Sequence, residues 1–491
     1  MTDTAPHLPT PLVATTTLDT SMSLLVEPVD ALMAKDPLCV AHHLPVQEVA
    51  QQMAQRRSSA ALVLQNDTLM GLLTEHDLSA RVVARAHPVH VPVSEVLTLN
   101  PHCVRRGVPA FEAMLLMARH GIHHVPVLDG ERPVGLLTAN DLLRAQQRSP
   151  LWLARSIDRQ PGLPGLVEAC TQVPLLQLDL VAADASAHHT GHLITAITDA
   201  VTVRLLALAE RELGPPPLPY AWVAAGSQAR QEQTARSDQD NALVLDDAFD
   251  PKVHGPYFEA LARFVCDGLH ACGYVHCPGD MMARNPQWRL TRSEWAEHFA
   301  QWTRTPDPTA LMLTSVFFDL RTVHGETELV ESLRAELLHG ARDNPLFLGH
   351  LVANALSRTP PLGWLGGLTT ARSGEHKGKI DLKHLGVVPI VDLARVHALA
   401  GGHAEVNTLE RLNAAVRGGA LSEQNGRDLS ETWEFLAVTR LRHQARQLRQ
   451  GLPADSFLDP QALSPFERTQ LKDAFEVVRT VQTLLGQRYR F

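Results

Sequence analysis

The chain has 491 residues, of which 45% are hydrophobic and 20% charged, and its formal net charge is −9. This composition is typical of a soluble globular protein, and the length predicts about three domains. A dedicated nucleic-acid-binding protein usually presents a basic face, so no nucleic-acid partner is expected. No apolar run approaches the ~18 residues that a membrane helix needs, so no membrane segment is expected either.

The N-terminal residues 1–22 are rich in Thr and Pro and contain no Lys or Arg. A secretory signal needs a basic start and an apolar core, so this segment predicts a disordered leader. The six cysteines form no C-x-x-C pair and indicate no disulfide framework. These features favour a cytoplasmic protein.

Residues 23–148 contain an internal repeat with a constant offset of 64 residues. DPLCV at 36–40 aligns with NPHCV at 100–104, and GLLTEHDL at 71–78 aligns with GLLTANDL at 135–142. The hydrophobic spacing of the first copy predicts, in order, a helix, two short strands and a second helix. These elements fall at 45–57, 60–64, 69–73 and 75–85. Neither copy can bury its apolar face alone, so we expect the two to pack on each other.

The repeated G-L-L-T-x-x-D-L signature resembles that of a CBS-domain pair. The resemblance implies a cleft for an adenine nucleotide, and a homodimer formed through the pair is also expected. The candidate regulatory ligands are Thr74, Asp77, Thr138 and Asp141. A helix N-terminus with a Thr hydroxyl suits phosphate, but the same residues equally suit helix capping. The first copy has RRSSAALVL where the second has the more family-like HGIHHVPVL, which would leave one cleft without a ligand.

A helical linker is predicted over residues 149–214. Pro and Gly mark its beginning, apolar residues then recur every three to four positions, and Gly214 ends the pattern. The following PPPLP is a stiff connector to the next domain.

The next domain, predicted over 215–340, opens with an apolar strand, a Gly226-Ser227 turn and a second strand that follows Asp238 and Asp240. Residues i and i+2 of a strand point the same way, so the two carboxylates should lie together. Like charges so close are costly unless a cation binds between them. Mg²⁺ or Mn²⁺ shared with substrate phosphates suits this pair, and the glycine lets the backbone approach a phosphate.

A third acid, Asp319, lies inside the apolar run VFFDL, which predicts a strand over 313–325. A buried carboxylate is expensive, so Asp319 needs a metal, a cation such as Arg321, or a proton. No P-loop or H-E-x-x-H motif is present.

The pattern G-S, D-x-D and a later D resembles the nucleotidyltransferase superfamily. The longer string GSQARQEQTARSDQDNALV is similar to nucleotidyltransferases related to bacterial PII-uridylyltransferase, which carry CBS pairs upstream. The resemblance implies that Asp238, Asp240 and Asp319 are catalytic metal ligands, with Asp319 alternatively the base. It also implies a nucleotide-binding group, namely Gly226, Ser227, Arg230 and Glu232. Ala229 stands where relatives often have Gly.

Residues 341–491 predict an all-helical domain, which the resemblance identifies with substrate binding. Lys379, Asp381 and Lys383 could line the nucleotide cleft or form a solvated basic loop.

The fold expected is therefore α/β multidomain: a CBS pair, a nucleotidyltransferase-type mixed sheet with helices, and a helical C-terminal domain. The function expected is metal-dependent transfer of a nucleoside monophosphate from an NTP to a hydroxyl of a protein or small molecule, regulated by an adenine nucleotide. The alternative is a non-catalytic nucleotide sensor with a degenerate transferase core.

Overall fold

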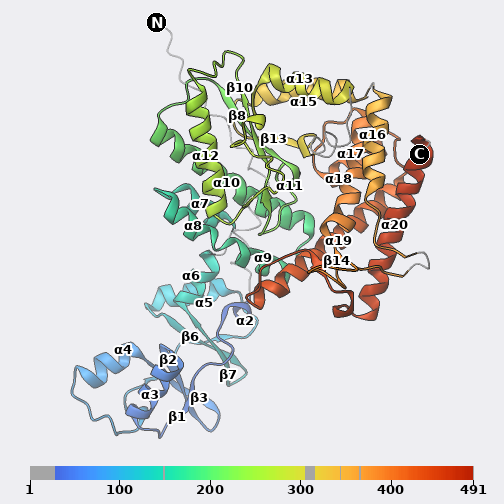
Figure 1. The fold of residues 1–491 in the computed structure, drawn as a ribbon. Helices are drawn as coiled ribbons and strands as arrows, with labels where there is room; N and C mark the ends of the chain where they lie inside the picture. The colour runs from blue at the N-terminus through green and yellow to red at the C-terminus, as the bar shows by residue number, and fades with distance from the viewer. Residues whose placement is uncertain (1–27, 148–149, 305–315, 343, 364–366, 490–491) are drawn as a thin grey trace. The chain divides into compact units, whose positions relative to one another are not determined.

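The structure is a computed structural model that describes residues 28–147, 150–304, 316–342, 344–363 and 367–489 (Figure 1). The chain divides into two compact units, Met1–Trp152 and Leu153–Phe491. The leader predicted over 1–22 lies outside the described residues.

The first unit contains two small sheets, with strand orders β1-β2-β3-β4 and β5-β6-β7. The two copies of the repeat each contribute a parallel pair and an antiparallel hairpin. The hairpins carry the same register shift, between Val63 and Leu64 in one and between Val127 and Leu128 in the other. The strands are β1 (Cys39–Ala41), β2 (Ala60–Gln65), β3 (Thr68–Thr74), β4 (Thr98–Leu99), β5 (Val104–Arg105), β6 (His124–Asp129) and β7 (Arg132–Thr138).

The helices of this unit repeat in the same way. α3 (Val46–Arg56) ends at Arg57 and α5 (Ala110–His120) ends at Gly121, both with left-handed backbone. The second helix of the first copy starts as α4 (Glu75–Asp77) and continues as a π-helical turn over Leu78–Val83, where the second copy has α6 (Ala139–Gln147). The short α2 (Val29–Leu32) precedes the first copy but packs into the core of the second. The duplicated architecture predicted from the 64-residue offset is therefore confirmed.

The second unit is built on a mixed sheet in the order β12-β10-β8-β13. β8 (Tyr220–Ala225) is antiparallel to both of its neighbours, β10 (Asn241–Leu245) and β13 (Leu320–Gly325). β12 (Arg289–Thr291) runs parallel to β10 at one edge. β8 and β10 are buried along their whole length, because helices cover both faces of the sheet.

Alternate residues of the two central strands enter two different cores. Trp222 and Leu243 pack under α10 (Ala187–Leu213) and α12 (Gly255–Ala271). Val223 and Val244 pack with α13 (Arg292–Arg304), α15 (Thr327–Arg342) and the C-terminal helices. The period-two alternation of a strand thus places the sheet between two helical layers.

The segment predicted as a helical linker is part of this second unit. α7 (Pro150–Asp158), α8 (Leu163–Cys170) and α9 (Val173–Ala182) lead into α10, and their apolar side chains share one core with the sheet and α12. By length and composition alone, α10 is apolar enough to cross a membrane. No segment of that length and hydropathy was expected from the sequence. More than half of its most apolar window, 56%, is buried in the unit, as in a core helix.

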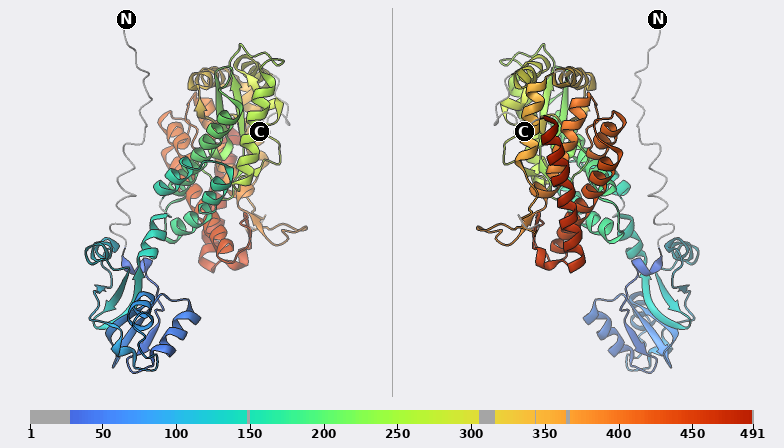
Figure 2. Two further views of the ribbon diagram at one scale, coloured as in Figure 1. Left: turned by 90° about the vertical axis from the view of Figure 1, so that its left-hand side faces the viewer. Right: turned by 90° about the vertical axis from the view of Figure 1, so that its right-hand side faces the viewer.

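The C-terminal region is helical, as predicted, and its helices lie side by side in Figures 1 and 2. α17 runs through their middle and is buried from Pro389 to Leu399. Because these helices share one apolar core with β8 and β10, the region packs directly on the sheet. The helices are α16 (Pro345–Ser357), α17 (Val388–Gly401), α18 (Thr408–Arg417), α19 (Glu423–Arg449) and α20 (Pro465–Tyr489).

The pairing of β13 with β8 ends at Gly325, so a substitution at this residue tests how closely the two strands pack there. Gly325 has a φ of +89°, and a Cβ there would lie 2.1 Å from the carbonyl oxygen of Tyr220. We expect Gly325→Ala to lower the free energy of unfolding by about 2–4 kcal/mol, measured by urea denaturation. Gly340→Ala, on an open face of α15, should instead stabilise by about 0.5–1 kcal/mol. Equal unfolding curves for the two variants would contradict this register.

Candidate active site

The Gly-Ser turn and the aspartate pair lie together at one end of β8 and β10. The amide of Ala225 donates to the carbonyl of Asp240 at 2.9 Å, which joins the two strand ends. Gly226 follows with a φ of +56°, and a Cβ on it would lie 2.7 Å from Oδ2 of Asp240. A side chain at position 226 would therefore collide with the carboxylate, which explains why a glycine stands there.

Asp238 and Asp240 alternate with a residue that points into the core. Gln239 is buried and donates through its amide to the carbonyls of Cys266 and Tyr274, at 3.0 and 3.1 Å. Strand alternation turns the two aspartates the other way. Oδ1 and Oδ2 of Asp238 lie 3.2 and 3.5 Å from Nζ of Lys383, which follows the short strand β14 (Ile380–Asp381). Lys383 therefore lies at this site, one of the two alternatives that the sequence left open.

The two carboxylates differ in their electrostatic environment. Burial and then the neighbouring charge of Asp238 raise the pKa of Asp240 to about 6. Burial also acts to raise the pKa of Asp238, but the ammonium of Lys383 outweighs it and holds this pKa below its ordinary value. Oδ1 of Asp240 is buried without a hydrogen-bond partner. A divalent cation fits this pair, because it would satisfy that oxygen and relieve the repulsion between the carboxylates.

Asp319 does not join this pair, which corrects its assignment as a third metal ligand or base. It lies just before β13 rather than inside the strand, and its side chain is fully buried. Its two oxygens accept hydrogen bonds from three guanidinium groups. The donors are Arg230 at 2.6 Å, Arg395 at 3.1 and 2.6 Å, and Arg411. A carboxylate held in this way has no oxygen to offer a metal or a proton.

The guanidinium groups also decide the charge state of Asp319. Burial alone would raise its pKa, but Arg395, Arg411 and Arg230 together hold the pKa far below its ordinary value of 3.8. A cation is thus the partner that this acid requires, one of the three possibilities open from sequence. Arg321, the cation expected, instead pairs with Asp199 at 2.8 Å.

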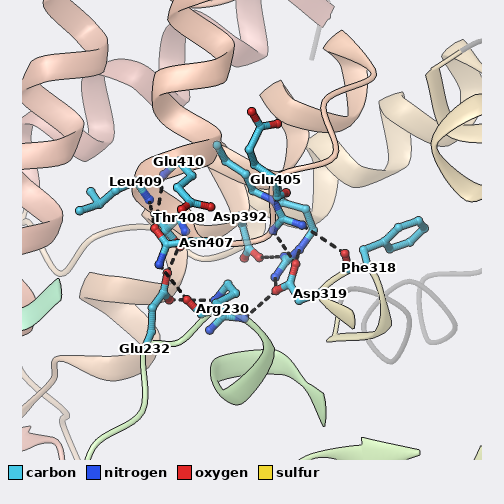
Figure 3. Close-up of polar contacts among 12 residues, drawn as sticks. Arg230, Glu232, Phe318, Asp319, Asp392, Glu405, Asn407, Thr408, Leu409 and Glu410 are labelled. Atoms are coloured by element: carbon cyan, nitrogen blue, oxygen red, sulfur yellow. Dashed lines mark hydrogen bonds and ion pairs between the residues drawn. The ribbon is translucent and has the colours of Figure 1, made fainter. Parts of the chain in front are cut away.

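The three arginines form a larger ion-pair network, which we call the Asp319 network (Figure 3). Arg230 also donates to Glu232 at 2.8 Å, and Arg395 donates to Asp392 at 2.6 Å. Three acids therefore balance these three arginines, so that no buried charge is left uncompensated, and the partly exposed Arg358 also contacts Asp392 at 3.3 Å. The network joins the segment after α11 (Gly226–Ala229) to α17 and α18.

Glu232 makes a second connection to the C-terminal helices. Its carboxylate accepts from the amide of Thr408 at 2.9 Å, at the first residue of α18. A carboxylate is favourable at the positive end of a helix. The neighbouring Asn407 donates to the carbonyl of Arg230 at 2.7 Å. Glu232 therefore positions Arg230, and both are fixed from the helical side.

Two of these arginines, Arg395 and Arg411, were missed by sequence reasoning. The signal available was a pair of charged residues, Asp392 and Arg395, one helical turn apart within the apolar stretch VVPIVDLARVHALA at 387–400. Charges at such positions need buried partners. Nothing local, however, shows that the partner is Asp319, 76 residues away.

A small cavity of about 50 Å³ opens beside the aspartates. Three of the residues predicted to bind nucleotide line it, namely Ser227, Arg230 and Glu232, and Lys383 lies on its wall. Gly226 contacts Asp240 instead. Over the described ranges, no group of three or more His, Cys, Asp or Glu residues is arranged to hold a metal. A cation at this site would therefore depend on Asp238 and Asp240, completed by substrate oxygens.

The four residues expected at the repeat form two matching capping boxes. The hydroxyl of Thr74 donates to Asp77 at 2.6 Å and accepts from its amide, and Thr138 and Asp141 do the same at 2.6 Å. The capping interpretation, left open by the sequence, therefore describes their contacts in this structure. Asp77 is also paired with Arg81 at 3.2 Å.

The sheet, its Gly-Ser turn and its D-x-D pair define the class of the second unit as a nucleotidyltransferase-type domain. Residues 171–309 match the family described as "Putative nucleotidyltransferase DUF294", and residues 345–489 match its "Putative nucleotidyltransferase substrate binding domain". Residues 29–84 and 93–148 match the CBS domain family. The chain belongs to the DUF294 nucleotidyltransferase family in the arrangement that carries a CBS pair upstream.

Among the similar curated proteins are CBS domain-containing proteins. The chain is 32% identical over 97 residues to the CBS domain-containing protein YhcV of Bacillus subtilis, covering 20% of this chain and 69% of YhcV. It is 29% identical over 123 residues to CBSCBSPB5 of Arabidopsis thaliana, covering 25% of this chain and only 22% of that protein.

Solved structures match a similar share of the chain. One is an uncharacterized conserved protein from Pyrococcus horikoshii, with 28% identity, covering 25% of this chain and 93% of that one at a TM-score of 0.24. Another is a CBS domain protein from Pyrobaculum aerophilum complexed with AMP, with 24% identity. The match covers 23% of this chain and 88% of that one at a TM-score of 0.22.

The Asp319 network yields a test of stability and its pH dependence. Asp319→Asn leaves three buried arginines without their shared carboxylate, so we expect the free energy of unfolding to fall by about 3–5 kcal/mol at pH 7. The pKa of Asp319 is depressed, so its stabilisation is complete above its ordinary value and is lost as the pH falls toward the folded value. The difference between wild type and variant should therefore shrink in acid, which urea denaturation at several pH values measures.

A matched control is Asp267→Asn, which removes an exposed partner of Arg284. We expect it to cost less than about 1 kcal/mol. If Asp319→Asn is no more destabilising than this control, the network does not hold the unit together.

Proposed function

We propose that this protein is a metal-dependent nucleotidyltransferase that moves a nucleoside monophosphate from an NTP to an acceptor hydroxyl and releases pyrophosphate. The observation that carries the proposal is the close approach of the Gly226 turn to Asp240, whose buried Oδ1 has no partner, at the mouth of two antiparallel strands. The family match supports the same reaction class.

Asp238 and Asp240 would hold Mg²⁺ or Mn²⁺ together with oxygens of the triphosphate. The ion, when bound, neutralises phosphate charge and orients the chain of phosphates. Ser227 and the backbone that follows Gly226 lie where a phosphate would be received, and Lys383 supplies a positive charge beside Asp238. These residues act by positioning and by electrostatic stabilisation, the main contributions to transfer at phosphorus.

The reaction follows from this arrangement. The acceptor oxygen attacks the α-phosphorus, the bond from that phosphorus to the oxygen bridging to the β-phosphate breaks, and pyrophosphate leaves with the electron pair. The hydroxyl proton passes to water, because Asp319 is committed to Arg230, Arg395 and Arg411. Asp319 is then a positioning residue, which holds Arg230 at the wall of the cavity.

The acceptor we propose is a hydroxyl on a signalling protein, as the resemblance to PII-uridylyltransferases implies. A small-molecule acceptor is the other outcome. Incubation of cell lysate with each labelled NTP, followed by mass spectrometry of what becomes labelled, separates the two.

We further propose that the CBS pair binds an adenine nucleotide that regulates transfer, and that the pair forms a homodimer. Thr74 and Thr138 each stand at the N-terminal end of a helix, a position that suits phosphate, and each hydroxyl is bonded to Asp77 or Asp141 in this structure. For the dimer, α5 presents an exposed apolar face with Phe111, Met114 and Leu115, which are 36%, 44% and 38% exposed. Exposed apolar patches commonly mark an interface.

Asp240→Asn tests the transferase directly. The amide keeps the shape of the side chain but loses the charge that would hold the cation, so we expect nucleotide incorporation to fall by about 10³-fold or more. Incorporation of radiolabelled nucleotide in the presence of Mg²⁺ or Mn²⁺ measures this. Glu259→Gln, on the exposed side of α12, should retain wild-type activity.

The competing hypothesis is a non-catalytic sensor with the same fold. It predicts that wild type and Asp240→Asn behave alike, with no incorporation above background from any NTP. That result would remove the transferase proposal.

Calorimetry tests the regulatory site. Titration of AMP, ADP or ATP should give heat with the wild type that Asp141→Ala abolishes. Because Asp141 also belongs to a capping box, Ser422→Ala, which removes the cap of α19, controls for lost capping and should leave the heat unchanged. Heat that survives Asp141→Ala would place the ligand elsewhere.

A further inference from the structure

The cavity beside the aspartates has a wall of buried polar groups that find no partner in the described structure. Both amide atoms of Gln233, the hydroxyl of Thr234 and the indole nitrogen of Trp433 have none. These side chains are 1%, 4% and 2% exposed, and all three line the cavity. Unpaired buried polar groups are rare in folded proteins, so three on one small cavity indicate a ligand.

Besides Arg230, which is paired with Asp319 and Glu232, two further cationic side chains line this cavity. Lys383 lies on the wall, as does Arg440 of α19. Arg440 donates through Nε to the hydroxyl of Ser456 at 2.9 Å, while its two terminal nitrogens make no hydrogen bond or ion pair with any described residue. Asp238 and Asp381 act on Arg440 only through longer-range attraction. A guanidinium with two open donors is suited to a phosphate or carboxylate.

The segment that carries Gln233 and Thr234 is fixed from several sides. The amide of Thr234 donates to the hydroxyl of Ser237 at 3.0 Å, and the amide of Ala235 donates to the side chain of Gln177 at 2.7 Å. Gln177 donates in turn to Gln444 of α19 at 3.3 Å. The donors of the cavity are therefore held before any ligand arrives, which lowers the cost of binding.

The chemistry and size of the cavity define the class of ligand. Hydrogen-bond donors predominate on its wall: three cations, an indole N–H, hydroxyls of Ser227 and Thr234, and an amide nitrogen, against the one carboxylate of Glu232. The hydroxyl of Ser237 also lies there but donates to the carbonyl of Thr234. A volume of about 50 Å³ corresponds to roughly four water molecules. This space fits a phosphoryl group and not a base with its ribose.

We propose that this cavity binds the terminal phosphoryl group of the nucleotide, and then one phosphoryl group of the pyrophosphate that leaves, through Gln233, Thr234, Trp433 and Arg440. The inference rests on the proposed transferase for the identity of the phosphate donor. Through Trp433 and Arg440, the helical domain would bind the triphosphate directly. This role would come in addition to any binding of the acceptor by the same domain.

Binding of inorganic pyrophosphate in the presence of Mg²⁺ tests this without requiring turnover. Trp433→Phe keeps an aromatic side chain but removes the N–H together with the five-membered ring, and should weaken binding about tenfold; Arg440→Met should weaken it about a hundredfold. Arg449→Met, which removes an exposed arginine from the last turn of the same helix, should bind as the wild type does. Thermal unfolding of each full-length variant shows whether it is folded.

The outcomes separate this inference from the transferase proposal. Pyrophosphate binding that depends on Arg440 and Trp433, in a protein that transfers no nucleotide, supports the phosphate site and overturns the transferase. Transfer by the wild type, with folded Arg440→Met and Trp433→Phe variants that bind pyrophosphate normally, overturns the phosphate site. Absence of any pyrophosphate binding to the wild type at millimolar concentration overturns it as well.

Discussion

The buried carboxylate of Asp319 is the constraint on which the second unit depends. A fully buried charge must be compensated, and here the compensation comes from arginines on three separate segments: one after α11, one on α17 and one on α18. Each of these segments is thereby fixed relative to β13. The same contacts bring the C-terminal helices against the end of the sheet, which is why Lys383 reaches Asp238 and why Trp433 and Arg440 close the adjacent cavity.

The Asp319 network has balanced charges, whereas the aspartate pair Asp238 and Asp240 at the strand ends does not. Around Asp319, three acids face three arginines and every carboxylate oxygen of Asp319 is used. At Asp238 and Asp240, one lysine faces two acids, one carboxylate has a raised pKa, and one oxygen is left without a partner. The first arrangement is complete without a ligand and acts as structure. The second is stabilised by an added cation, and such incomplete sites are where function is expected.

Sequence reasoning predicted most of the fold because the informative patterns are local or repeated. The 64-residue offset fixes the repeat, down to the matched register shifts at Val63 and Val127. The contact of Gly226 with Asp240 also follows from two neighbouring strands and a turn. The features that sequence reasoning missed depend on contacts between residues far apart in the chain. The run VFFDL predicts a buried acid, but the sequence does not indicate whether a metal, a proton or a distant arginine neutralises it, and Arg411 lies 92 residues away. The helical segment 149–214 was interpreted as a linker because its partner, α12, follows only after the strands of the Gly-Ser and D-x-D region.

The same long-range packing changes how the helical domain should be understood. A domain that merely delivered an acceptor could sit on the core through apolar contacts alone. Here α17 and α18 bring charged side chains into the core, and α19 brings an arginine and a tryptophan to the cavity beside the aspartates. The position of Arg230 at that cavity depends on Asp319 and Glu232, and Glu232 is held by the first turn of α18. Any displacement of the helical domain would therefore disturb the wall of this cavity and the ion-pair network together, so that docking of this domain and assembly of the site are one event.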